Sequence, residues 1–293
     1  MVTVLVIGAS GRIGSHLVKE LDRNSEGITV RLATSRTEVA DQWRAEGRES
    51  VVLDLNRPER FGEVLQGVDR VFLLTGYSAD MLYQSKMFVD AAATAGVNHI
   101  VHLGVFSSGR DMIPHFAWHE LIETYIQASG IEWTHLHPNV ITESLLALDP
   151  PITETGSFMV PWREAALGWV CAADIAAVAA AVLREGPDKH GGAHYWLSTE
   201  VVTGPQVADV LSEVLGTKVI CSMPGPEALA AHAGSIPSAA DRLYAESAVA
   251  TMRQTALGNM KHQAVIRDDV QTVLGRPGTT VAEWARENLA SAT

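Results

Sequence analysis

The chain has 293 residues, of which 47% are hydrophobic and 19% charged, and this composition excludes a disordered or fibrous protein. Acidic side chains outnumber basic ones by 34 to 22, so the formal net charge of −12 disfavours attraction to a phosphate backbone. We therefore expect an enzyme-sized globular protein without a nucleic-acid partner.

The number of cysteines and the hydropathy of the chain indicate in which cellular compartment the protein is expected. Cys171 and Cys221 are the two cysteines, and no apolar stretch is long enough to cross a bilayer. A charged leader followed by an apolar segment is also missing from the sequence. We expect a soluble cytoplasmic protein with reduced thiols and no membrane contact, and the sequence leaves open whether it forms a homodimer.

Apolar runs alternate with longer amphipathic segments through the first half of the chain. The runs lie at about residues 2–7, 28–34, 50–53, 69–74, 98–104 and 131–136. Alternating strands and helices joined by right-handed crossovers predict an α/β fold, a Rossmann-like doubly wound parallel sheet with helices on both faces. Functional side chains should gather beyond the carboxyl ends of these strands.

The plainest interruption of this pattern is Asp149-Pro150-Pro151. Later segments predict a helix over 172–184, a strand over 193–197 and a helix over 204–215. We expect a nucleotide-binding Rossmann domain over 1–148, to which 166–198 return. A smaller, mostly helical substrate lobe is expected over 149–165 and 199–293.

Three glycines stand between the first strand and the first helix, at positions 8, 11 and 14. Gly8 permits a tight turn, Gly11 lets the backbone approach a phosphate, and Gly14 allows close packing of the helix on the strand. The helix then points its free N–H groups at an anion. The spacing predicts a dinucleotide site, and the alternative is an ordinary tight turn.

The end of the second strand indicates which dinucleotide is preferred. The sequence Ala33-Thr34-Ser35-Arg36 lacks the acid that usually binds the ribose hydroxyl of NAD. Arg36 is suited to a 2′-phosphate, helped by Ser35, and Arg12 lies in the facing loop. We expect NADP(H) to be preferred over NAD(H), unless both arginines are simply solvated surface residues.

Other strand ends supply further cofactor candidates. Asp54 and Leu55 are placed to flank the adenine, whereas Thr75, Gly76 and Gly104 are expected along the ribose and nicotinamide. Ordinary turn chemistry is the alternative for each. The predicted cofactor residues are Gly8, Ser10, Gly11, Arg12, Ile13, Gly14, Ser35, Arg36, Asp54, Leu55, Thr75, Gly76 and Gly104.

Several later segments carry a family resemblance. They lie at residues 97–103, 129–134, 136–139, 169–183, 274–277 and 281–285. Together with the glycine spacing, they resemble the NmrA-like, atypical branch of the short-chain dehydrogenase/reductase superfamily over almost the whole chain. The resemblance implies relatives that include quinone reductases, triphenylmethane and azo reductases, isoflavone-type reductases, and redox sensors that bind NADP(H) without turnover.

The chain departs from the superfamily at its usual catalytic pair. No tyrosine is followed four residues later by lysine, and His119 stands where many relatives carry a lysine. His115, His119 and Glu123 share one helical face, so Glu123 can hold or charge His119. We predict that His119 is catalytic and supplies a proton, the alternative being a half-exposed helix face with a local ion pair. No metal site is expected, because His115 and His119 lack an obvious third ligand.

Substrate candidates come from the same strand ends. His135 and His137 alternate on the sixth strand and share one face, and His137 is where relatives commonly carry arginine. Asn139 either contacts the substrate or stabilises a turn, and the sequence favours neither alternative. Trp133, Trp162 and Trp169 are expected to be scaffold. The predicted substrate residues are Phe106, Ser107, His115, Trp118 and Asn139.

The sequence predicts an NADPH-dependent reductase that transfers hydride to a small, conjugated, electron-poor substrate such as a quinone, enone or dye-like molecule. The competing hypothesis is a non-catalytic NADP(H)-binding redox sensor of NmrA type, motivated by the missing Tyr-Lys pair. A nucleotide-sugar epimerase or dehydratase ranks last, because it suffers from the same absence.

Overall fold

A computed structural model describes residues 1–147 and 151–289. Its centre is a seven-stranded sheet in the order β10-β6-β5-β4-β1-β2-β3, and every neighbouring pair is parallel. The strands are β1 (Val2–Ile7), β2 (Ile28–Thr34), β3 (Ser50–Val52), β4 (Arg70–Leu73), β5 (His99–Leu103), β6 (Glu132–Pro138) and β10 (Ala193–Leu197). The predicted Rossmann-like α/β fold is confirmed, and the predicted strand positions hold within one or two residues.

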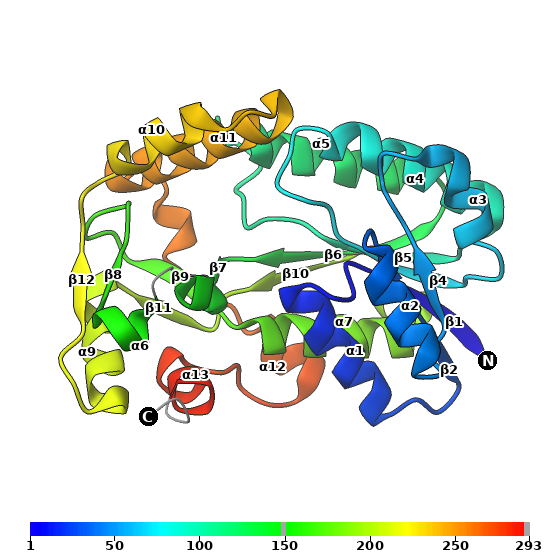
Figure 1. The fold of residues 1–293 in the computed structure, drawn as a ribbon, viewed down its shortest axis with the longest axis horizontal. Helices are drawn as coiled ribbons and strands as arrows, with labels where there is room; N and C mark the ends of the chain where they lie inside the picture. The colour runs from blue at the N-terminus through cyan, green and yellow to red at the C-terminus, as the bar shows by residue number, and fades with distance from the viewer. Residues whose placement is uncertain (148–150, 290–293) are drawn as a thin grey trace.

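Helices cover both faces of the sheet (Figure 1). One layer holds α3 (Phe61–Val64), α4 (Met81–Ala95) and α5 (Pro114–Ala128), and the other holds α1 (Arg12–Arg23), α7 (Ala172–Glu185) and α12 (Asp269–Leu274). Because successive strand residues point to opposite faces, Val4 and Val6 of β1 join the core under α1 and α7, whereas Leu5 and Ile7 join the core under α4. Burial on both faces explains why the strands read as continuous apolar runs.

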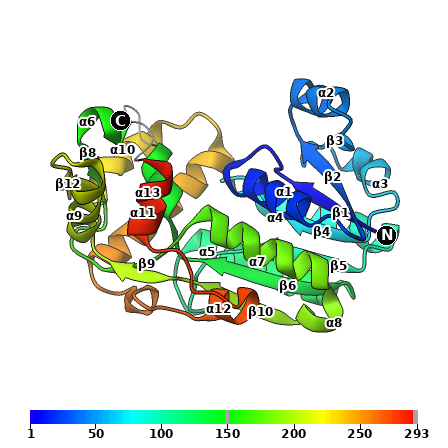
Figure 2. The ribbon, with the colours of Figure 1, turned by 90° about the horizontal axis from the view of Figure 1, so that it is seen from below.

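A smaller lobe lies beyond the carboxyl ends of the strands (Figure 2). Its strands form a three-stranded and a two-stranded sheet, and a core around Trp169 and Trp284 fills its centre. The strands are β7 (Val140–Ile141), β9 (Leu167–Val170), β11 (Glu200–Val202), β8 (Ser157–Met159) and β12 (Ile220–Ser222). The helices are α6 (Ile152–Thr155), α9 (Gly204–Leu215), α10 (Glu227–Ser235), α11 (Ala239–Ala256) and α13 (Val281–Asn288).

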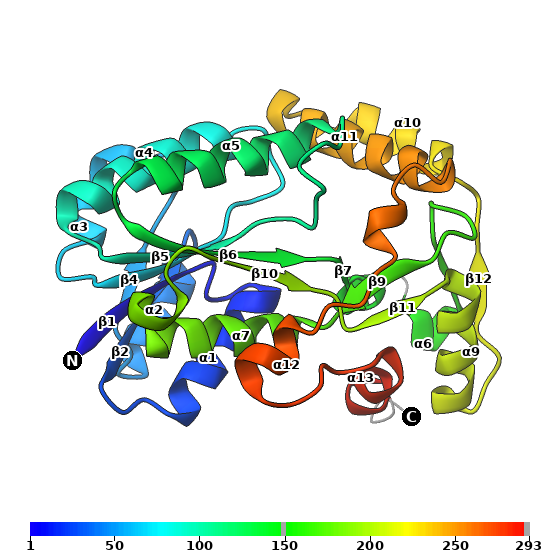
Figure 3. The same cartoon turned by 180° about the vertical axis from the view of Figure 1, so that it is seen from behind.

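Helix α11 matters most for the site, because it packs against α5 and extends the α4–α5 layer over the strand ends (Figure 3). Ser247 of α11 adds polar contacts to the packing of α11 on α5. Its hydroxyl accepts from the backbone N–H of His115 at 3.0 Å and lies 2.8 Å from Nδ1 of the same residue. Through α11, the small lobe thereby reaches the carboxyl ends of the central strands.

The division into domains stays a prediction. Helix α7 packs on α1 and β10 pairs with β6, but α12, from the expected substrate lobe, also packs on α7 and β10. Helix α2 (Thr37–Ala45), the short helix α8 (Pro187–His190) and three 3₁₀ turns complete the described elements, the turns lying at Pro58–Arg60, Thr142–Ala147 and Lys261–Gln263. Asp149 and Pro150 of the predicted interruption lie outside the described residues.

In the described part of the chain, no helix combines the length and apolarity needed to span a membrane.

Candidate functional site

The glycine turn has the geometry that its spacing predicts. Gly8 has a φ of 69°, in the left-handed region that favours glycine. A Cβ on Gly14 would come within 2.1 Å of the Gly8 carbonyl oxygen, so only glycine allows α1 to approach the turn this closely. Gly11 precedes α1, no side chain caps this helix, and its first turn contains no acid. The N-terminal N–H groups of α1 are thus available to an anion such as a pyrophosphate.

A cavity of about 380 Å³ runs from this turn to the end of β2. Ser35, Arg36, Asp54 and Leu55 all line it. The Thr34 hydroxyl accepts a hydrogen bond from the Arg36 backbone N–H at 3.3 Å and so fixes the start of the loop that carries the guanidinium. Arg36 is exposed, and within residues 1–147 and 151–289 it forms no ion pair. The Arg36 side chain therefore remains able to pair with an anionic ligand.

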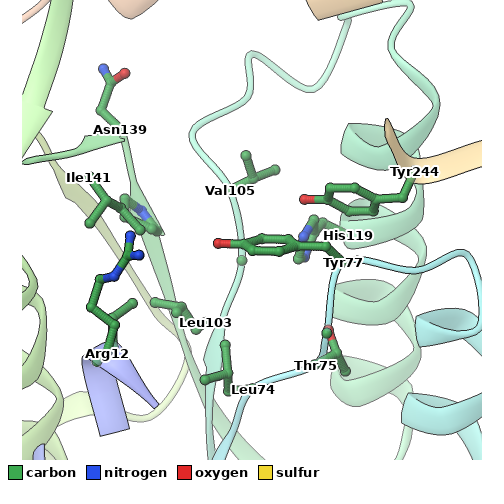
Figure 4. Close-up of a pocket in the computed structure, with 14 residues that line it drawn as sticks. Arg12, Leu74, Thr75, Tyr77, Leu103, Val105, His119, Asn139, Ile141 and Tyr244 are labelled. Carbon is green, nitrogen blue, oxygen red and sulfur yellow. The ribbon is translucent and has the colours of Figure 1, made fainter. Parts of the chain in front are cut away.

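A second cavity of about 430 Å³ adjoins the first, because Leu74, Thr75 and Gly76 line both. It lies between Tyr77 and Tyr244 on one side and Arg12, Asn139 and Ile141 on the other (Figure 4). Leu74 and Leu103 form its floor in this view. The two cavities together make one continuous cleft along the carboxyl ends of β1, β2, β4 and β5, as doubly wound sheets place their ligands.

The structure gathers the predicted cofactor residues around this cleft. All of them line one of the two cavities except Gly14, which lies beneath the turn. Arg12 and Ile13 line the second cavity instead of the first. Their roles in binding stay predictions, but their convergence follows from the topology alone.

His119 lies in the wall of the second cavity with 8% of its surface exposed. Burial, with the nearby histidines His115 and His137, lowers the pKa of His119 to about 3, so its imidazole is neutral at physiological pH. The predicted partnership with Glu123 is not formed: the Glu123 carboxylate lies 3.6 Å from His137 Nδ1, and no hydrogen bond joins it to His119 among the described residues. The geometry thus offers a neutral hydrogen-bonding imidazole in place of a charged acid.

Two tyrosines of the second cavity were absent from the sequence prediction. The rings of Tyr77 and Tyr244 lie 5.3 Å apart between centroids, with their planes inclined by 43°. Burial raises the pKa of the Tyr244 hydroxyl above its usual value. Tyr77 directly follows Gly76, so the strand-end rule could have found it. Nothing in the sequence marks Tyr244, since only the packing of α11 on α5 brings it to the cleft.

The predicted substrate residues separate into two groups. Phe106, His115 and Asn139 line a third cavity of about 210 Å³, and Asn139 also borders the second cavity. Ser107 and Trp118 line none of the three cavities, because the Ser107 hydroxyl donates to Glu120 at 3.0 Å and Trp118 packs against the core under α4. The roles of these two residues in substrate binding stay predictions, as do those of Phe106, His115 and Asn139.

Both polar atoms of the Asn139 side-chain amide form hydrogen bonds within the protein. Its Nδ2 donates to the Gln263 carbonyl at 2.8 Å, and its Oδ1 accepts from the Val140 backbone N–H at 3.0 Å. These bonds join β6 to the small lobe and use the amide for structure. Among the tryptophans expected to be scaffold, Trp169 is buried in the lobe core, whereas Trp162 also borders the third cavity.

Comparison with known proteins gives matches over most of the chain. The NmrA-like family matches residues 2–256. An NAD(P)H azoreductase from Xenophilus azovorans is 29% identical over 295 residues, with 98% of each chain covered. Triphenylmethane reductase from Citrobacter sp., in a crystal structure complexed with NADP(H), has a TM-score of 0.80 and 25% identity, covering 98% of this chain and 100% of its own.

The fold is also that of the NADPH-dependent quinone oxidoreductase QOR2 from Escherichia coli complexed with NADPH. Its TM-score is 0.79 at 23% identity, with 97% of this chain and 99% of the other covered. The glycine turn and continuous cleft described above agree with these similarities. The chain belongs to the NmrA-like family and is an oxidoreductase.

Proposed function

We propose that this protein is an NADPH-dependent reductase of small, conjugated, electron-poor molecules such as quinones, enones or dyes. The observation that carries the proposal is the continuous cleft, in which a cavity lined by the glycine turn and the end of β2 opens into a second cavity flanked by aromatic rings. Similarity to azo and triphenylmethane dye reductases supports the same class of substrate.

The residues of the first cavity fit NADPH. The N-terminus of α1 and the turn at Gly8 and Gly11 suit the pyrophosphate, because N–H groups and the helix dipole favour negative charge there. Arg36 and Ser35 suit the 2′-phosphate, since a guanidinium pairs with phosphate through two parallel hydrogen bonds. This arrangement favours NADPH over NADH.

The second cavity suits a planar substrate. Tyr77 and Tyr244 offer ring faces for stacking, and Leu74 and Leu103 offer an apolar floor that excludes water. When bound, the reduced nicotinamide supplies a hydride, which adds to the electron-poor atom of the substrate. For a neutral acceptor such as a quinone, an enone or an azo dye, one proton completes the reduction, whereas a cationic triphenylmethane dye takes up the hydride alone. A neutral His119 N–H can polarise the acceptor by hydrogen bonding, and the proton then comes from water.

The experiment is to incubate the protein with NADPH and a panel of quinones, enones, imines and azo or triphenylmethane dyes. Substrate-dependent loss of the reduced-nicotinamide absorbance, stoichiometric with product, supports the reductase. The competing function is the NADP(H) sensor, favoured by the absence of a Tyr-Lys pair. Tight cofactor binding without turnover of any panel member would reject the reductase and favour the sensor.

A further inference from the structure

Five histidines gather on the face of the sheet that α5 covers, behind the wall of the cofactor cleft. They are His102 on β5, His135 and His137 on β6, His194 on β10, and His119 on α5. Neighbouring rings lie 5.7 Å apart for His119 and His102, 5.4 Å for His102 and His135, and 5.3 Å for His135 and His194. The group ends at His194, which is exposed on the edge strand.

At this edge Glu123, His137 and His194 converge from three elements. One ligand atom of each lies within 4.8 Å of the others, and no other group of three such side chains does so in residues 1–147 and 151–289. His137 Nε2 is 2.9 Å from His194 Nδ1, and Glu123 Oε1 is 3.6 Å from His137 Nδ1. Two imidazole nitrogens bound to one tetrahedral zinc ion, each at about 2.0–2.1 Å, are separated by about 3.3 Å. The observed 2.9 Å is a hydrogen bond between the two rings, so the nitrogens need to move apart by a few tenths of an ångström to bind one ion.

The surroundings prepare His137 as a ligand. The Val105 carbonyl oxygen lies 3.1 Å from His137 Nδ1 and accepts its N–H, which leaves the lone pair on Nε2. Trp196 stacks on the imidazole at 4.0 Å between centroids and holds its plane. At Gly104 a Cβ would come within 2.6 Å of Glu123 Oε1, so the glycine provides the space that the carboxylate occupies. Such outer contacts orient metal ligands in proteins.

The surroundings of Glu123 leave its carboxyl group open to a cation. The Glu123 side chain is only 12% exposed, and no lysine or arginine pairs with it in the described part of the chain. His102 next to it has no hydrogen-bond partner for either ring nitrogen.

We propose that Glu123, His137 and His194 bind a divalent transition-metal ion, with zinc as the best fit to two imidazoles and one carboxylate. The His194 ring lies nearly parallel to that of His137, at 16°, and its Nδ1 now shares a hydrogen bond with His137 Nε2. To admit the ion, His194 turns outward, which its exposed position allows, and the Glu123 carboxylate turns from the Nδ1 side of His137 toward Nε2. Water fills the remaining coordination positions. The ion ties α5, β6 and β10 together and braces Val105, and the proposal is independent of the reductase function.

The test uses the full chain stripped of metal with a chelator and titrated with Zn²⁺ by calorimetry. We expect saturable binding of one equivalent and a rise in Tm. Co²⁺ should bind the same site and give visible d–d absorption. Cu²⁺ should quench tryptophan fluorescence, because Trp196 stacks on His137 and the Trp133 ring lies 5.1 Å from that of His194. Trp196→Phe should still bind Cu²⁺ and lose part of that quenching.

Variants decide the location of the site. His194→Ala removes a ligand from an exposed edge position, and we expect at least about a 100-fold loss of Zn²⁺ affinity with an unchanged circular dichroism spectrum. Glu123→Gln, which keeps the shape and removes the charge, should also weaken binding. His232→Ala, at an exposed position on α10, is the matched control and should bind like the parent. Equal affinities of His194→Ala and His232→Ala, or no saturable Zn²⁺ binding by the parent chain, would overturn the proposal.

Discussion

The aromatic ring of Tyr77, in the loop after β4, lies 5.3 Å from that of Tyr244 on α11. This pair joins the two lobes along one wall of the second cavity, since Tyr77 follows a strand of the central sheet and Tyr244 belongs to a helix of the small lobe. A planar substrate can contact both rings only when α11 is docked on α5. Substrate binding and lobe packing are thereby linked.

Removal of the Tyr244 ring tests this relationship. Tyr244→Ala should raise the KM for quinone or dye about tenfold, because a stacked aromatic contact is worth about 0.5–1.5 kcal/mol. NADPH affinity should stay close to that of the parent. Tyr244→Phe keeps the ring and should have nearly parental KM, as should Tyr83→Ala at an exposed position outside the cavity. Unchanged KM in Tyr244→Ala would place the substrate elsewhere.

Arg36 should determine the preference for the phosphorylated cofactor. Arg36→Ala is expected to weaken NADPH binding about 10- to 100-fold, the worth of hydrogen bonds to a charged group, and to leave NADH binding nearly unchanged. Fluorescence titration with both nucleotides measures the two affinities. Arg23→Ala, exposed at the end of α1, serves as the control. Equal losses for both nucleotides would reject Arg36 as the phosphate-binding residue.

Gly14 should tolerate no side chain. In Gly14→Ala the new Cβ would meet the Gly8 carbonyl oxygen at 2.1 Å, so α1 must move away from the turn. We expect a loss of about 1–3 kcal/mol in the free energy of unfolding and much weaker dinucleotide binding. Urea denaturation measures the first effect and calorimetry the second. Gly62→Ala, at a helical position with no heavy atom within 4 Å, should be neutral or slightly stabilising.

His119 should act without changing its charge. His119→Ala is expected to lower kcat about 10- to 100-fold, while NADPH affinity stays the same. Because the pKa of His119 is about 3, the imidazole is neutral in the whole range from about pH 5 to 8, and the pH profiles of parent and variant should be parallel. A limb in the parent profile that disappears in the variant would show that His119 titrates during turnover.

His115 should make the fold sensitive to acid. Burial lowers its pKa from 6.5 to about 4, so between these values the unfolded chain binds a proton that the folded chain does not. Its contribution to stability is therefore present above about pH 6.5 and is lost as the pH falls toward 4. From pH 7.5 to 5 the loss is about 2 kcal/mol. Urea denaturation at both pH values should show a smaller acid loss for His115→Gln; identical acid losses would contradict this origin.

Much of the cofactor half of the cleft could be predicted from the sequence because its signals are local. A strand, a glycine turn and a helix follow one another within residues 2–23, and each glycine has a steric reason that depends on near neighbours. Parallel topology then carries the other strand ends to the same edge without any side-chain detail. Ser35, Arg36, Asp54 and Thr75 meet for this reason.

The sequence by itself determined the sheet, the glycine turn and the family, since periodicity and local steric fit depend on residues that are close together in the chain. Only the tertiary structure decided what surrounds the reacting end of the cleft. It paired Tyr77 with Tyr244, tied Asn139 to Gln263, and moved Glu123 from His119 to His137. These contacts depend on how α5 packs on the sheet and how α11 packs on α5. The spacing of residues along a helix shows which of them share a face, but not which neighbour that face contacts.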